Sequence, residues 1–152
     1  MRKFITTALV CLSVVAVAAA PSIAAGGPAK KTTGDITFSN TGYGIGDVPA
    51  HWVFNAIEGS PAKGNVSYSD QFGSYEAKVT SVSVDSVNHD ATFSATVTVD
   101  NYDYAVVGDT FSWTVHDRGE QGVGNDYFTY LPVGGGSVDL PVITAGNIQV
   151  LG

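Results

Sequence analysis

Oxygen-bearing side chains cluster in one glycine-rich segment of the chain, between residues 117 and 126. They are Asp117, Glu120, Asn125 and Asp126, with glycines at 119, 122 and 124. Carboxylate and amide oxygens are ligands that Ca²⁺ prefers, at roughly six to eight per ion, and the glycines let backbone carbonyls join them. The segment is therefore a candidate calcium site, although its spacing differs from that of an EF-hand loop. The alternative is a hairpin loop whose Asp and Asn residues favour turns and keep the edge of a sheet soluble.

Other groups that could do chemistry are more scattered. A second acidic set is open to the same two interpretations and consists of Asp100, Asp103 and Asp109. The histidines lack the short spacing of a zinc site: His51, His89 and His116. A hydrolase needs a nucleophile beside a base, or paired carboxylates, and the Ser and Thr residues instead fall on the polar faces of expected strands. We expect no enzymatic activity. A hydrolase built from the two acidic loops is the least favoured alternative.

Aromatic residues are plentiful, with two Trp, seven Tyr and seven Phe. Most alternate with polar residues and are expected to fill a core. Tyr102 and Tyr104 flank a turn and are candidates to contact a ligand, because an exposed aromatic ring can stack on a sugar or on a partner protein.

The first 25 residues have the pattern of a secretory signal peptide. Arg2 and Lys3 precede an apolar run over residues 5–20, and small residues end the segment at Ala24 and Ala25. The run is short for a membrane anchor, so we expect no stable membrane insertion after cleavage. The one cysteine, Cys11, lies inside this segment. We therefore expect a secreted chain that folds without disulfides.

Charge narrows the range of partners. Removal of Arg2 and Lys3 with the signal peptide leaves five basic residues against fourteen acidic ones. Nucleic acids and anionic membranes reward clustered Lys and Arg, so we expect neither as a partner. The acidic balance is compatible with cation binding or simply with solubility.

Alternation with a period of two residues dominates the mature sequence. The clearest case runs from Ala91 to Val99, where apolar residues alternate with Thr and Ser. A second, from Thr110 to His116, is followed by the acidic loop and another aromatic strand. Short strands separated by turns, with no helical period, predict an all-β fold. Consecutive hairpins favour an antiparallel meander closing into a small β-barrel, and a β-sandwich is the alternative.

The same alternation predicts the core and one irregularity. Apolar residues change parity between Val79 and Val82, which a β-bulge near Thr80 and Ser81 would accommodate. The predicted core is Phe38, Trp52, Phe54, Val66, Tyr68, Phe93, Val97, Phe111, Trp113 and Val115. We expect residues 1–25 to be the signal peptide, 26–34 a flexible tether and 35–152 a single domain.

Several stretches resemble a known family. A small β-domain of secreted bacterial proteins, the post-COAP type, is similar at residues 54–56, 59–68, 81–84, 91–95, 108–111, 117–120, 126–128 and 146–150. The resemblance implies an all-β extracellular domain of unknown role, and it brings no catalytic residues.

The function expected from the sequence is therefore binding. We expect a secreted, non-enzymatic β-domain that interacts with a surface protein or a polysaccharide at the cell surface or outside the cell. The alternative is a binder of a small ligand or carbohydrate that uses the barrel mouth or exposed aromatic residues. No cofactor other than calcium is expected.

Overall fold

A computed structural model describes residues 28–40, 48–102, 105–119, 125–131 and 142–152. Alternating side chains build eight strands: β1 (Lys31–Asn40), β2 (Val48–Ile57), β3 (Lys63–Asp70), β4 (Gly73–Asp85), β5 (Asp90–Tyr102), β6 (Thr110–His116), β7 (Tyr127–Leu131) and β8 (Val142–Leu151). The part of the chain described here contains no helix that is long and apolar enough to cross a membrane.

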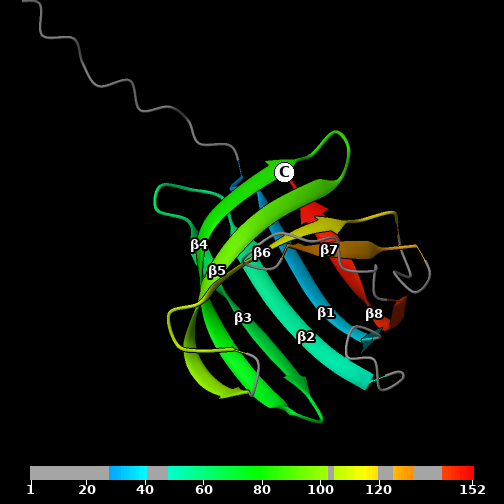
Figure 1. Cartoon of the computed structure of the whole chain (residues 1–152). Coiled ribbons are helices and arrows are strands. Elements are labelled where there is room, and N and C mark those ends of the chain that lie inside the picture. Colours follow the sequence, from blue (N-terminus) through cyan, green and yellow to red (C-terminus); the bar gives the residue numbers. More distant parts are fainter. Residues whose placement is uncertain (1–27, 41–47, 103–104, 120–124, 132–141) are drawn as a thin grey trace, which may run out of the picture.

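The strands form one antiparallel sheet that rolls into a nearly closed barrel (Figure 1). Strands β1 to β7 pair in chain order, and β8 returns to pair with β1, so β7 and β8 are the two edge strands. The predicted all-β meander and barrel are confirmed. We call the end where β1 begins and β8 ends the terminal end. The opposite end, where β1 passes to β2 and β3 to β4, is the open end.

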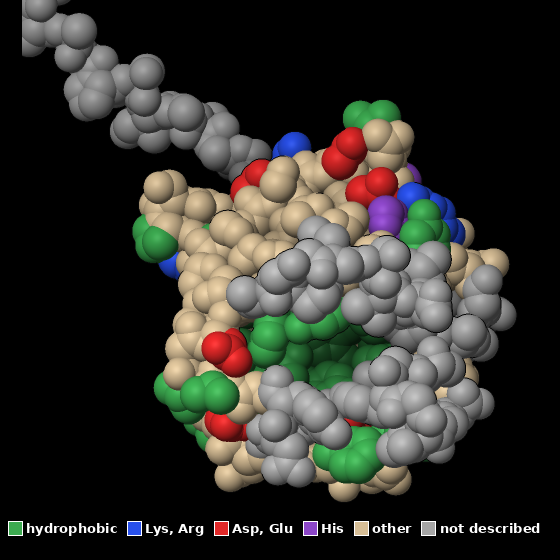
Figure 2. Space-filling view, viewed as in Figure 1, with side chains coloured by type: hydrophobic (Ala, Val, Ile, Leu, Met, Phe, Trp, Pro, Cys, Tyr) green, Lys and Arg blue, Asp and Glu red, His purple; other side chains and the backbone are tan. Residues whose placement is uncertain are grey.

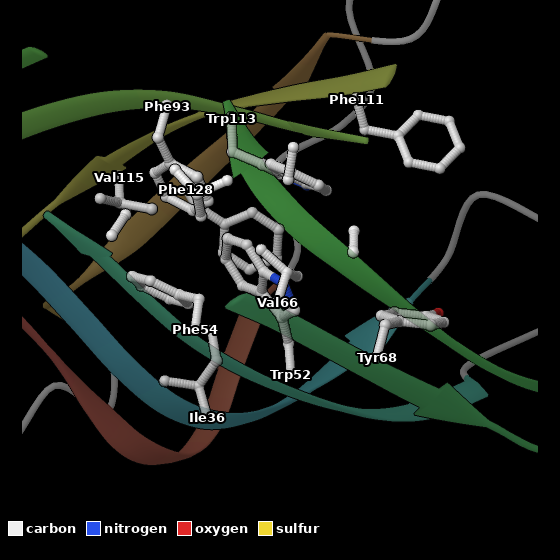
Figure 3. Close-up of a cluster of buried hydrophobic side chains, with 14 of the residues drawn as sticks. Ile36, Trp52, Phe54, Val66, Tyr68, Phe93, Phe111, Trp113, Val115 and Phe128 are labelled. Atoms are coloured by element: carbon white, nitrogen blue, oxygen red, sulfur yellow. The ribbon is translucent and has the colours of Figure 1, made fainter. Parts of the chain in front are cut away.

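Aromatic side chains fill the middle of the barrel (Figure 3). The Trp52 ring lies 4.4 Å from Phe54, 4.7 Å from Phe128 and 5.5 Å from Trp113, measured between centroids. Such aromatic contacts stabilise a core beyond the area they bury. All of the predicted core residues are buried: Phe38, Trp52, Phe54, Val66, Tyr68, Phe93, Val97, Phe111, Trp113 and Val115.

Two irregularities in the β4–β5 ladder set which side chains face inward. The predicted bulge is confirmed, because Val79 pairs with Ala95 and Ser81 with Ser94, which leaves Thr80 as the extra residue. A second shift leaves Thr98 unpaired. It reverses the parity of β5, so Val99 is 46% exposed although its alternation predicted an inward position.

The expected tether over residues 26–34 is wrong for its last part, because Lys31–Gly34 belong to β1. Thr32 is fully buried, and its hydroxyl donates to the Gln149 carbonyl at 3.0 Å. Gly34 faces the interior, where a Cβ would overlap the ring of Phe54. A glycine and two threonines look like linker composition, but here the glycine makes room for an aromatic ring.

Gly34→Ala is therefore expected to lower the free energy of unfolding by about 1–3 kcal/mol, since overpacking a tight core is destabilising. Phe54→Leu in the same chain should recover part of this loss, because the smaller side chain frees the space. Urea denaturation of the two single variants and the double variant measures the coupling. Additive losses would contradict the contact.

Candidate functional site

At the terminal end, two carboxylates hold the free edge of β8. Asp126 Oδ2 accepts the Ile148 N–H at 2.8 Å, and Asp117 Oδ2 accepts the Val150 N–H at 3.0 Å. The other oxygens accept N–H groups of the loop itself, from Arg118 to Asp126 and from Gly119 to Asp117. We call this pair the carboxylate clasp. It satisfies donors on an edge strand that would otherwise lack partners.

The clasp changes the interpretation of the predicted calcium site. Asp126 is 4% exposed, and all four carboxylate oxygens of Asp117 and Asp126 already accept backbone N–H groups. Asn125 is exposed, and Glu120 lies outside the described residues. Among the described residues no group of three or more His, Cys, Asp or Glu is placed to hold a metal. Calcium at this loop stays a prediction, and the geometry assigns its two aspartates a structural role.

Beside the clasp lies a cluster that the sequence did not reveal. Asp90 Oδ1 accepts hydrogen bonds from His116 Nδ1 at 2.8 Å and from Arg118 Nη2 at 2.7 Å. The His116 ring stacks on Tyr127 with centroids 4.1 Å apart, and the Arg118 guanidinium lies 5.6 Å from the same ring. Of these residues, Asp90 and Arg118 line an open depression, together with Val87, Asn88, His89, Asp117 and Gly119. The cluster could have been found from the pairing of the β5 and β6 strands, because Asp90 and His116 are directly opposite each other in that pair.

The cluster shifts two ionisation equilibria. Burial raises the pKa of the Asp90 carboxyl, but hydrogen bonds from His116 and Arg118 outweigh this effect and hold the pKa below its ordinary value. The Arg118 pKa is raised, first by a hydrogen bond with Tyr127 and also by Asp90, against the opposing effect of burial. The guanidinium is thus held as a cation between two partners.

The open end carries a different set of side chains, which form an aromatic belt on the inner face of the barrel. Tyr68 and Tyr75 stack with centroids 5.1 Å apart, Tyr75 lies 5.7 Å from Phe111, and Phe111 lies 5.7 Å from Tyr130. The belt therefore runs from β3 to β7 and consists of Tyr68, Tyr75, Phe111 and Tyr130. Figure 3 places Tyr68 and Phe111 beyond the packed group around Trp52.

A hollow lies at the open end of the barrel, beside this belt. Figure 2 shows the open end of the barrel hollowed, with hydrophobic side chains inside the opening. The rings of the belt are slightly more exposed than the packed rings, at 7% for Tyr75 and 8% for Phe111 against 0% for Phe93 and 1% for Trp52, and Tyr130 is only half-buried. Two of the inward residues, Ala50 on β2 and Ala77 on β4, have small side chains. A barrel of eight strands is just wide enough to be filled by its own side chains or to hold one small ligand.

The remaining predicted site residues divide between described and undescribed positions. Tyr104 and the side chain of Tyr102 lie outside the described residues, as does Asp103. Asp109 accepts the Val106 N–H at 3.0 Å and so caps the turn before β6. Asp100 lies opposite Tyr75 on the inner face at the open end.

Comparisons with known proteins add no relative. No protein-family model, curated protein or solved structure matches the chain. The resemblance to the post-COAP type therefore stays a prediction, and function must be argued from the geometry alone.

Asp126→Asn is expected to lower the free energy of unfolding by about 1–3 kcal/mol, because an amide cannot accept both N–H groups and leaves a buried donor unpaired. Hydrogen exchange should become faster at the Ile148 amide in particular. Glu76→Gln, on the exposed outer face of β4, is the control. Unchanged exchange at Ile148 would contradict the clasp, and measuring both proteins with and without a calcium chelator tests the predicted calcium in the same experiment.

Asp90→Asn is expected to destabilise the protein near pH 7 and to have little effect in strong acid. A carboxyl whose pKa is lowered by folding stabilises the native state above its unfolded pKa of about 3.9, and the effect is lost as the pH falls through the folded pKa. Urea midpoints of both proteins between roughly pH 2 and pH 7 should therefore converge at the acid end. A difference that is constant with pH would show that Asp90 acts only through packing.

Proposed function

We propose that the protein is an exported, non-catalytic binding protein that holds a small, largely apolar molecule in the open end of its barrel. The observation that carries this proposal is the hollow above the aromatic belt (Figure 2). Binding sites for small molecules are concave and mostly apolar, with a few polar groups that fix orientation, and barrel mouths are a common location. The belt offers this combination, because Tyr68, Tyr75 and Tyr130 present both rings and hydroxyls.

The packing of the barrel supports a ligand that is small. The middle and the terminal end are filled by Trp52, Phe54, Phe93, Trp113 and Phe128. A ligand is therefore limited to the part of the interior near the open end. Rings of the belt lie at mutual angles between 16° and 64°, and therefore present both faces and edges to the space between them. Planar or branched apolar groups pack well against such walls.

The polar depression at the terminal end supports a structural role instead of catalysis. Asp90, His116 and Arg118 are occupied by one another, and Asp117 is occupied by β8. A reaction site would need a group placed to attack a substrate. Three cross-strand bonds join hydroxyls of β5 to hydroxyls of β6, and the Thr98 hydroxyl of β5 donates to the Glu76 carbonyl. Binding of a surface protein or polysaccharide stays the broader alternative predicted from sequence.

Titration of the mature protein with N-phenyl-1-naphthylamine tests the proposal. Trp52 and Trp113 are the two tryptophans of the chain, and Trp113 lies 6.1 Å from Phe111 of the belt, so a bound probe should change tryptophan emission saturably. Phe111→Ala should weaken binding by about fivefold or more, because it removes one wall of the site.

Val99→Ala is the matched control, since Val99 projects from the outer face of neighbouring β5. Thermal melting first establishes that both variants are folded. The absence of a saturable signal in the wild-type protein, or equal affinities for all three proteins, would overturn the proposal.

A further inference from the structure

We infer that the ligand of the open end is a hydrophobic cation, meaning an organic amine or quaternary ammonium attached to an apolar group. This inference rests on the proposed function and adds the charge of the ligand. Three features of the open end lead to it: inward carboxylates at the rim, an aromatic belt beneath them and the absence of basic residues from that end.

Two carboxylates face the interior at the rim of the barrel. Asp70 follows Tyr68 by two residues on β3 and is half-buried. Its Oδ2 accepts the Tyr68 hydroxyl at 2.8 Å and its Oδ1 accepts the Phe72 N–H at 2.7 Å, so it contributes negative charge to the rim while both oxygens are hydrogen-bonded. Asp100 is opposite Tyr75 across the β4–β5 ladder. Residues directly opposite in an antiparallel pair share a face, and Tyr75 faces inward, so Asp100 does as well. The shift at Thr98 is what returns Asp100 to the inner face, between exposed Val99 and exposed Asn101.

Each rim carboxylate thus adjoins a ring of the belt. A cation above the face of a tyrosine or phenylalanine is attracted by the ring quadrupole, and a carboxylate within a few ångströms adds a Coulombic attraction that is strengthened by partial burial. Aromatic walls with acidic groups at the entrance are the chemistry that recognises quaternary ammonium groups.

The distribution of charge along the barrel argues against an anionic ligand. Every Lys and Arg of the mature sequence is at or toward the terminal end, or on the outer face: Lys30, Lys31, Lys63, Lys78 and Arg118. Among the described residues of the connections at the open end, Asp109 is acidic and none is Lys or Arg. In Figure 2, an acidic side chain lies at the left border of the hollow, and the visible basic side chains lie away from it. An anionic ligand would meet repulsion without a compensating cation.

A pair of isosteric probes tests the charge directly. Benzyltrimethylammonium and neopentylbenzene have nearly the same shape, and only the first is charged. We expect Asp100→Asn to weaken binding of the cation by about fivefold to tenfold and to leave binding of the neutral probe unchanged. Asp70→Asn should act in the same direction. Glu76→Gln removes one carboxylate from the outer face and should change neither affinity.

Salt gives a second measurement that needs no variant. Added sodium chloride should weaken binding of the cation and not of the neutral probe, because only the charged contact is screened. Equal responses of the two probes to Asp100→Asn and to salt would overturn the inference and leave the proposed function standing. Failure of both probes to bind the wild-type protein would overturn the inference and the proposed function together.

Discussion

A sheet that is rolled into a barrel must satisfy the backbone groups of its two edge strands, and here carboxylates do so for β8 at the terminal end. The N–H groups of Ile148 and Val150 point away from β1, toward the gap that a continuous ladder would close. Asp126 and Asp117 accept them from the β6–β7 connection. The β6–β7 hairpin is thereby fixed against β8, and the aromatic residues it carries, Trp113 and Phe128, are held over Trp52. The described residues contain no cysteine, so the barrel is kept shut by such contacts without a disulfide.

The terminal end and the open end of the barrel carry different kinds of side chain. The charged and polar groups that brace the barrel, among them Asp90, His116 and Arg118, gather at the terminal end. The packed rings occupy the middle, and the belt lines the open end. The molecule therefore has a polar, internally paired end and an apolar, acidic end. The proposed binding role is assigned to the open end on the basis of this asymmetry.

Much of the fold could be predicted from alternation, which needs only the two-residue period of a strand. That period placed Phe93, Phe111 and Trp113 inside, and its break at Thr80 located a bulge. It failed at Val99, because the bulge at Thr98 lies within an unbroken alternating run and shows only in the pairing with β4. Gly34 was misjudged for a similar reason: its role depends on the ring of Phe54, twenty residues later in the chain. Composition singled out the loop of Asp117 and Asp126 as a candidate calcium site, which stays a prediction. The identity of their partners, backbone N–H groups of β8, depends on closure, which no local pattern encodes.

A crystal structure of the mature protein under xenon pressure tests the central claim most directly, because xenon occupies apolar space that side chains leave open. The account predicts one strong xenon peak at the open end, in contact with Tyr75 and Phe111, and no peak among Trp52, Phe54 and Phe93. A barrel that takes up no xenon at the open end, or that takes it up in the middle, would contradict the division between a packed interior and an open mouth.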